Sequence, residues 1–493
     1  MHSVNVQFSF IFYHLLARID CDNCNGSLVS VGNKQIYSDT EPSGEFAMSA
    51  EEAGKIESSV TIGRRELLKA GAALSVGSVL ASCSGAARAP SGQTIELPGA
   101  DELVPENMPN AFSKDEMERR WRKLREWMKK DGFDCLIVPQ RPQGNADVKW
   151  ISESNANWAV FPLEGQPTLI FRGGQDGADV EESSPVKFDV RVSRFNRSQV
   201  IIGRLGELGM ERARIGVGNL SGQMRQDEGG VSFITMSNLK KAFPNAEFDT
   251  AVPLLMKVKL ERGPEEIEVL RISSRVSELA IRAIVESGGP GVLQRDVWFH
   301  VFKTLLDASG EEPQRISIRG GDEGNTAGGR PLDEKFLAGQ ICSQELSGHV
   351  LGYASQVNHA MCVGTPPPKN WESAFQYVVE IFHALVDYAK PGVSFQEYSE
   401  FYRRKVEDRG KGYWGVVFHT GGASGDGPRM GPTRPDENGD LIVLPGMVFT
   451  IKPRFVIDGV ESPSAQFGDP VLITETGAER LGRREPELIA IGA

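Results

Sequence analysis

The feature that most constrains the fold is a set of long amphipathic helices in the second half of this 493-residue chain. One begins at Pro264, which suits a first helical turn, and acidic residues follow it at the positive end of the helix dipole. Its apolar residues form a single stripe: Ile272, Val276, Leu279, Ala280, Ala283 and Ile284. Similar patterns predict helices at about 294–308 and 371–389. Ser394 and Glu397 predict a capping box at the start of a fourth helix.

The region from residue 112 to residue 252 has a different pattern, in which short strands alternate with helices. Ser113 and Glu116 form a possible capping box for a helix that ends at Asp131-Gly132, and a second helix is predicted at about 198–208. Short apolar runs predict strands at 135–138, 158–161, 168–171 and 214–217. We therefore predict an α/β (α+β) chain with domains at 112–252 and 253–493.

The N-terminal region is predicted to carry an export signal. Arg64 and Arg65 precede a short apolar run that ends in Leu80-Ala81-Ser82-Cys83, the pattern of a twin-arginine signal with a lipobox. Lipidation at Cys83 predicts a membrane-anchored lipoprotein of the cell envelope or periplasm. Residues 84–111 are then a flexible tether, rich in small residues, Pro and Gly. Met48 is an alternative start, which would make residues 1–47 an over-extended N-terminus, and an amphipathic surface helix is the ordinary alternative to a signal at 48–83.

Composition excludes some functions and leaves others open. The net charge of −12 argues against nucleic-acid binding through a broad basic surface. Besides a lipidated Cys83, the cysteines Cys135, Cys342 and Cys362 would remain after cleavage before Cys83. A disulfide between Cys342 and Cys362 depends on strand register, which the sequence does not fix.

The second domain resembles the creatinase/prolidase/methionine aminopeptidase family, known as the pita-bread family. The resemblance lies in GQICSQELSGHVLGYASQVNHAMCVG at 339–364, LPGMVFTIKP at 444–453 and SAQFGDPVLIT at 464–474. It implies a β-hairpin, closing strands and helix pairs, a looser likeness of residues 112–252 to the family's N-terminal domain, and a homodimer. It also implies a hydrolase related to Xaa-Pro peptidases.

The resemblance implies a pair of metal ions held by two Asp, one His and two Glu, and this chain departs from that set. Glu345 stands at the first Asp and Gln356 at the second. His419 stands at the histidine, while Lys452 and Gly468 stand at the two glutamates. An amide, an ammonium and a missing side chain replace three anionic donors, so we predict no metal and no other cofactor.

Other residues near these motifs are candidates for chemistry. His359 follows Gln356 and could act as an acid or base, or be a structural hydrogen-bonding residue. His419 could likewise be a catalytic group or a buried structural histidine. Arg429 lies in a Gly- and Pro-rich loop, and Arg454 shares a strand face with Lys452. These arginines and Lys452 could bind the anionic end of a ligand, or they could be solvated.

Three functional hypotheses follow. In the first, the protein cleaves a small carboxylate-bearing C–N compound without metal, with His419 or His359 as general acid/base and Glu345 orienting it. Gln356, Lys452, Arg429 and Arg454 would bind the substrate, a small anionic or amino-acid-derived compound. In the second, the protein is a pseudoenzyme that only binds a ligand. The third is a metal-dependent Xaa-Pro dipeptidase or aminopeptidase, which would need new metal ligands. The ordinary alternatives are a solvent-facing Glu345 and a Lys452 that extends into solvent.

Overall fold

The computed structural model describes residues 104–105, 107–140, 146–173, 175–222, 228–321, 332–365, 369–407, 418–420, 429–430, 440–455 and 465–492. The predicted signal at 48–83, the lipidation site Cys83 and residues 1–47 lie outside the described residues, as do residues 84–103 and 106 of the predicted tether. Within the described residues, no helix is both long and apolar enough to cross a membrane.

The first described domain is built on a mixed sheet in the strand order β4-β3-β2-β1-β5-β6. Its strands are β1 (Cys135–Pro139), β2 (Trp158–Pro162), β3 (Thr168–Phe171), β4 (Asp189–Val192), β5 (Arg214–Val217) and β6 (Glu247–Thr250). Its helices are α4 (Lys114–Asp131), α5 (Ala146–Ser152), α6 (Gln175–Ser183), α7 (Arg197–Glu207), α8 (Phe233–Ala242) and α9 (Val252–Val258). The four predicted strands and both predicted helices of this domain are confirmed.

The second domain is built on a larger sheet. Its main path runs β12-β11-β13-β15-β9-β8-β10-β17, with β7 paired to β8 and both β14 and β16 paired to β15. The strands are β7 (Arg315–Gly320), β8 (Ile341–Val350), β9 (Tyr353–His359), β10 (Met361–Val363), β11 (Phe418–Thr420), β12 (Arg429–Met430), β13 (Val448–Ile451), β14 (Arg454–Phe455), β15 (Ala465–Ile473), β16 (Ala478–Arg480) and β17 (Ala490–Ile491).

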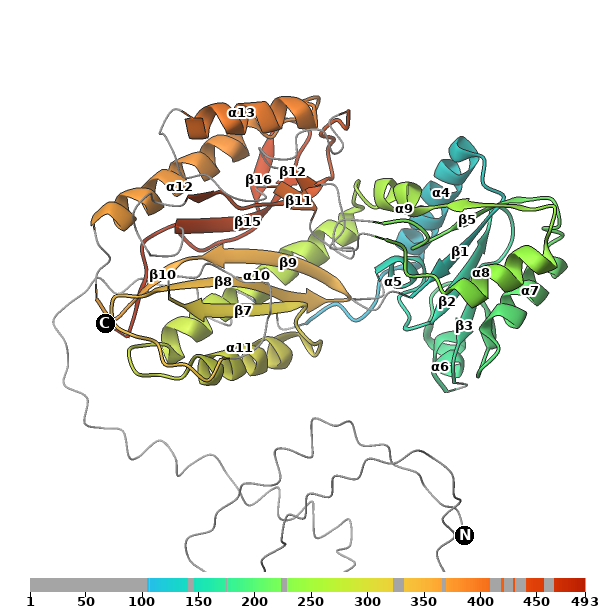
Figure 1. Cartoon of the computed structure of the whole chain (residues 1–493), viewed down its shortest axis with the longest axis horizontal. Coiled ribbons are helices and arrows are strands. Elements are labelled where there is room, and N and C mark those ends of the chain that lie inside the picture. Colours follow the sequence, from blue (N-terminus) through green and yellow to red (C-terminus); the bar gives the residue numbers. More distant parts are fainter. Residues whose placement is uncertain are drawn as a thin grey trace, which may run out of the picture. The chain divides into compact units, whose positions relative to one another are not determined.

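Four long helices cover this sheet, as the amphipathic patterns predict. They are α10 (Pro264–Ser287), α11 (Gln294–Ser309), α12 (Lys369–Tyr388) and α13 (Phe395–Glu407). Helix α10 packs on β8 and β9, α11 packs on β7, and α12 packs on β15 (Figure 1). The apolar stripe of α10 is buried, with Val276, Ala280 and Ile281 fully covered. Gly348 on β8 permits this close packing, because a Cβ there would lie 2.7 Å from the Val276 side chain.

The helix boundaries follow the predicted capping chemistry at two of three sites. At α13, Ser394 N donates to Glu397 Oε2 at 2.8 Å and Glu397 N donates to Ser394 Oγ at 3.1 Å, which is a full capping box. At α10, Pro264 occupies the first turn. At α4, Ser113 Oγ accepts from Glu116 N, but Ser113 N donates to Glu265. The backbone hydrogen bond that Ser113 would give to Glu116 in a local capping box is therefore accepted by Glu265 of α10.

Strand register decides the question of the disulfide. Cys342 on β8 lies directly opposite Met361, and Cys362 lies opposite Ile341. The two cysteines are thus offset by one residue, and their side chains enter different apolar cores, one beside α10 and the other beside α12. All three described cysteines are free thiols.

A buried ionic network joins α4, α5 and α10 to β9 through Glu266. The Glu266 carboxylate accepts hydrogen bonds from Trp150 Nε1 at 3.0 Å and Tyr353 Oη at 2.5 Å, and it pairs with Arg119 at 2.5 Å. Burial acts to raise the pKa of Glu266, but Arg120 and neighbouring arginines outweigh it and lower that pKa to about 2. Glu266 is therefore ionised at neutral pH and holds these four elements together.

Candidate functional site

Strand register brings most of the candidate residues to one face of the large sheet. His419 lies opposite Thr450, and Gly468 lies opposite Asn358. Gln356 lies opposite Ser347. Residues directly opposite, and residues two apart on one strand, direct their side chains to the same face. We call this the site face; it comprises Arg315, Ser343, Glu345, Ser347, Gln356, Asn358, His419, Thr450, Lys452 and Gly468.

The other face of the same strands packs against helices, which explains why the site face is polar. Leu346 and Val357, next to Glu345 and Gln356 in sequence, enter the core beside α10. Phe449 and Ile451 enter the core beside α12. Each of these strands is thus apolar toward its helices and polar toward the site face, and the polar side chains collect together.

The centre of the site face is a carboxylate held by two cations. Lys452 Nζ lies 2.9 Å from Glu345 Oε1, and Arg315 Nε lies 2.5 Å from Glu345 Oε2. The side chains are largely buried, with exposures of 9% for Lys452, 16% for Glu345 and 21% for Arg315. Burial acts to raise the pKa of Glu345, but Lys452, Arg315 and His419 together hold that pKa well below its usual range. Glu345 is therefore ionised and faces inward, not toward solvent.

Gly468 and Lys452 fit each other sterically. A Cβ at position 468 would lie 2.5 Å from the Cβ of Lys452 and 3.1 Å from its Cα. Ordinary van der Waals contacts between such carbons begin near 3.5 Å. The backbone at position 468 therefore has no room for any side chain while the chain at residue 452 keeps this path.

His419 lies on β11 beside this group and is 6% exposed. It lies opposite Thr450, two residues from Lys452, and a charge on His419 helps to lower the pKa of Glu345. Arg429 lies opposite His419 in the register of β11 and β12. Arg454 is half-buried on β14, opposite Gln466. The predicted residues Glu345, Gln356, His419 and Lys452 are thus brought together, with Arg429 and Arg454 on neighbouring strands.

His359 is not brought to the site face. It is three residues from Gln356, so the alternation of a strand directs it to the opposite side. There its ring stacks on Phe375 of α12, its Nε2 donates to the Glu487 carbonyl at 2.6 Å, and Arg484 Nε donates to its Nδ1 at 3.4 Å. Burial and the charge of Arg484 lower the pKa of His359 to about 3. This geometry fits the structural interpretation of His359 and not the acid/base one.

Gln356 is held within the site face by a neighbouring amide. Its Nε2 donates to Asn358 Oδ1 at 3.1 Å, and Asn358 Nδ2 donates to the Gln344 carbonyl at 2.6 Å. The chain of bonds fixes the orientation of both amides. The side-chain oxygen of Gln356, Oε1, is therefore the atom of this amide that is available to contact a ligand.

Sequence reasoning missed Arg315 and two buried hydroxyls. Arg315 lies on β7, and its alternation with Ser317 in RISIRG was the available signal for a polar strand face. Ser343 Oγ and Thr450 Oγ1 are buried and have no hydrogen-bond partner among the described residues. Buried hydroxyls are normally satisfied, so these two mark a place where a ligand or solvent belongs.

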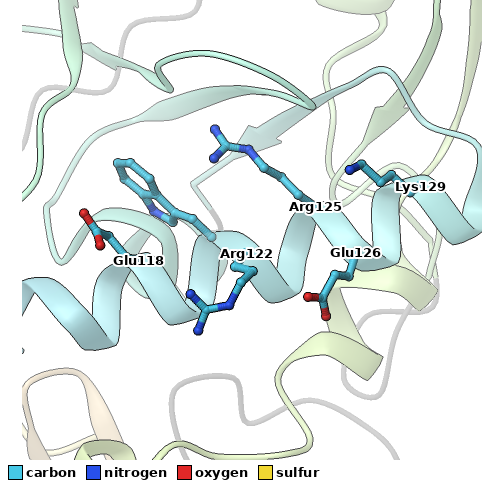
Figure 2. A pocket seen from close by; sticks show the side chains of 6 residues that line it. Glu118, Arg122, Arg125, Glu126 and Lys129 are labelled. Atoms are coloured by element: carbon cyan, nitrogen blue, oxygen red, sulfur yellow. The ribbon is translucent and has the colours of Figure 1, made fainter.

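A separate surface hollow of about 490 Å³ lies along α4 in the first domain. Figure 2 shows its labelled lining residues, Glu118, Arg122, Arg125, Glu126 and Lys129, which all come from this one helix. Both signs of charge are present, and Arg125 is already bound to the Gly165 carbonyl. The hollow shares no residue with the site face.

Comparisons with known proteins agree with this architecture. Residues 268–475 match the family model of metallopeptidase family M24, and residues 120–259 match that of the creatinase/prolidase N-terminal domain. The chain is 26% identical over 268 residues to the Xaa-Pro dipeptidase of Pyrococcus furiosus, covering 53% of this chain and 74% of the relative. It is 22% identical over 402 residues to the creatinase of a Bacillus species, covering 76% and 92% respectively.

The solved structures give the same class of fold. The Xaa-Pro dipeptidase from Bacillus anthracis matches with a TM-score of 0.65 at 17% sequence identity, covering 76% of this chain and all of that one. An N-terminal creatinase-type domain followed by a pita-bread domain is thus the class that the fold defines. The chain belongs to the pita-bread creatinase/prolidase family and is related to Xaa-Pro peptidases and creatinase.

The metal pair implied by a metallopeptidase family does not fit the residues of the site face. An ammonium at Lys452 has no lone pair to offer a cation, and Gly468 has neither a side chain nor room for one. The Gln356 amide is neutral and bound to Asn358. Among the described residues, no group of three or more His, Cys, Asp or Glu side chains is placed to hold a metal ion.

Proposed function

We propose that this pita-bread protein hydrolyses a small carboxylate-bearing C–N compound without a bound metal pair. The observation that carries the proposal is the buried Glu345–Lys452 ion pair at 2.9 Å, formed at two positions where the family resemblance implies metal ligands. In this proposal the fixed positive charge of Lys452 takes over the electrostatic work of a cation. The first-domain match to creatinase-type proteins is consistent with a small substrate.

The roles of the residues follow from their places on the site face. His419 is the general acid/base, because it is the histidine of this face and lies near the Glu345 carboxylate. Glu345 orients and stabilises the protonated imidazole, as a carboxylate does beside a catalytic histidine. Lys452 polarises the bond that is cleaved, while Arg429 and Arg454, on the neighbouring strands β12 and β14, add positive charge that attracts an anionic substrate to the site face.

We further propose that the protein is exported as a lipoprotein and acts as a homodimer. The export proposal rests on the twin arginines 64 and 65 and on Cys83. Cysteine-directed lipid labelling with a Cys83→Ser control tests it, and an unlabelled wild type contradicts it. Sedimentation velocity of the purified protein tests the dimer, and a monomer contradicts it.

A ligand-binding pseudoenzyme is the second proposal, and one observation favours it. The Glu345 carboxylate is already paired with two cations, Lys452 and Arg315, which leaves a net positive charge at the centre of the site face. A face of this kind can bind a polar ligand without performing chemistry on it. Saturable binding without product is the outcome that this proposal expects.

One experiment separates these proposals. The purified protein is analysed for bound metal, incubated with manganese or zinc, and assayed on Xaa-Pro dipeptides and on N-acyl and N-carbamoyl amino acids. Metal-free turnover that is lost in His419→Ala and Lys452→Glu supports the hydrolase. The matched controls are His300→Ala and Lys303→Glu, at side chains that are 45% and 73% exposed.

The other outcomes are equally informative. Stoichiometric bound metal together with cleavage of Xaa-Pro dipeptides contradicts the metal-free proposal and restores the metallopeptidase hypothesis. Metal-free turnover that survives in both site variants contradicts the assigned roles. Binding without turnover supports the pseudoenzyme.

A further inference from the structure

Arg315 has donors that nothing else in the described structure uses. Its Nε forms an ion pair with Glu345 Oε2 at 2.5 Å that lacks hydrogen-bond geometry, and no hydrogen bond from its two terminal nitrogens to a described residue is present. A guanidinium has five N–H donors in a rigid plane, so one edge can pair with Glu345 while the terminal pair remains available. The side chain is 21% exposed, so it is largely buried and still accessible from the site face.

Two orphaned hydroxyls lie on the same face. Ser343 is two residues from Glu345 on β8 and is 3% exposed, and Thr450 is fully buried on β13 opposite His419. Neither hydroxyl has a hydrogen-bond partner among the described residues. A buried hydroxyl that has left water and forms no hydrogen bond in the protein is unfavourable in free energy. A bound ligand or water molecule that forms this hydrogen bond removes the penalty. These two hydroxyls can form hydrogen bonds with a polar ligand or with solvent on the site face.

We propose that Arg315 is the residue that binds the carboxylate of the ligand, through its two terminal nitrogens in a bidentate contact. This inference rests on the proposed function, since it concerns the carboxylate-bearing compound of the same site. Glu345 holds Lys452 and also fixes the guanidinium edge, so the fork of Arg315 is oriented before the ligand arrives. The hydroxyls of Ser343 and Thr450 bind other polar atoms of the ligand.

The geometry also predicts selectivity. A planar guanidinium matches the two oxygens of a carboxylate and forms stronger, charge-assisted hydrogen bonds with it than with a neutral amide. Compounds whose carboxylate is converted to an amide should therefore bind much less tightly. A lysine cannot replace this arginine, because one ammonium cannot serve Glu345 and a ligand carboxylate in the same plane.

The test compares matched ligand pairs by calorimetry on the whole protein. The probes are N-acetylglycine and N-acetylproline, each with its primary amide. We expect the wild type to prefer the acids by roughly 10- to 100-fold, the effect of a charge-assisted bidentate contact. Arg315→Gln should reduce the preference to about 1, and Arg315→Lys should remove most of it.

The control is Arg271→Gln, which removes an arginine of similar exposure, 26%, that pairs with Glu479 away from the site face. It should leave the preference unchanged. If Arg315→Gln does not fold, Arg315→Lys decides the question because it keeps a cation beside Glu345.

The outcomes distinguish the role of Arg315 from the proposal that the ligand carries a carboxylate. A wild type that prefers acids while both Arg315 variants keep that preference overturns the role of Arg315 alone. A wild type without any preference for acids overturns both the carboxylate-bearing ligand and this inference.

Discussion

The ion pair between Lys452 and Glu345 makes a sharp prediction about stability. At 2.9 Å and an effective dielectric constant of about 20, the gross attraction is roughly 6 kcal/mol. Desolvation of two largely buried ions cancels part of it, and Arg315 still neutralises Glu345 when Lys452 is removed. We therefore expect a coupling energy of about 2–3 kcal/mol between the two residues, within the range found for close charge pairs.

A double-mutant cycle measures this coupling. Lys452→Met, Glu345→Gln and the double variant are unfolded in urea at pH 7, followed by tryptophan fluorescence. Lys452→Met alone should lose about 2–3 kcal/mol, since it leaves a buried carboxylate with one cation fewer. The double variant should recover most of that loss. The matched control is the exposed pair Lys303 and Asp307, where the coupling should stay below about 0.5 kcal/mol.

The pH dependence of the same proteins gives a second check. The pKa of Glu345 is depressed in the folded state, so its contribution to stability is present above the pKa of the unfolded chain, about 4.3, and is lost as the pH falls below it. Glu345→Gln should flatten the acid limb of the stability curve. A coupling below about 0.5 kcal/mol together with an unchanged acid limb would refute the buried ion pair.

Three further predictions concern sites around this pair. Gly468→Ala should destabilise the protein by about 1–3 kcal/mol in thermal melts because of its contact with Lys452, whereas Gly203→Ala, in an open helical position, should stabilise it by up to about 1 kcal/mol. Glu266→Gln should cost about 3–5 kcal/mol, because it leaves Glu116 as the carboxylate that balances both Arg119 and the buried Arg120, and the wild-type contribution should fade as the pH drops from about 4.3 toward 2, measured by urea unfolding in acid. Thr450→Val should leave the unliganded protein equally or more stable, by up to about 1 kcal/mol, yet weaken ligand binding in calorimetry, because its hydroxyl has no partner among the described residues. A loss of stability below about 0.5 kcal/mol in Gly468→Ala or Glu266→Gln would contradict these arguments. A Thr450→Val variant that is destabilised but binds ligand normally would contradict the argument about its hydroxyl.

The fold could be predicted from the sequence because its signals are local. The stripe of α10 and the capping box of α13 each depend on residues within one or two turns, and both are found as predicted. At α4 the prediction was only partly met. Glu265, distant in sequence, takes the hydrogen bond that a local capping box would assign to Glu116.

The site was harder to predict because it depends on strand register. Glu345 and Lys452 could be paired from motif positions alone. His359 was grouped with Gln356 although three residues separate them on one strand, a spacing that sends their side chains to opposite faces. Arg315 gave no motif at all, and only the pairing of β7 with β8 reveals that it reaches Glu345.

The steric fit between Gly468 and Lys452 has a consequence for how such a site can change over evolutionary time. A glutamate introduced at position 468 alone meets the Cβ of residue 452, whatever its own charge. A glutamate introduced at position 452 alone places a second carboxylate against Glu345. Because a glutamate at position 452 would carry the same Cβ as Lys452, changing both residues does not remove the contact at position 468, and recovery of both carboxylates also requires the backbone near residue 452 to move.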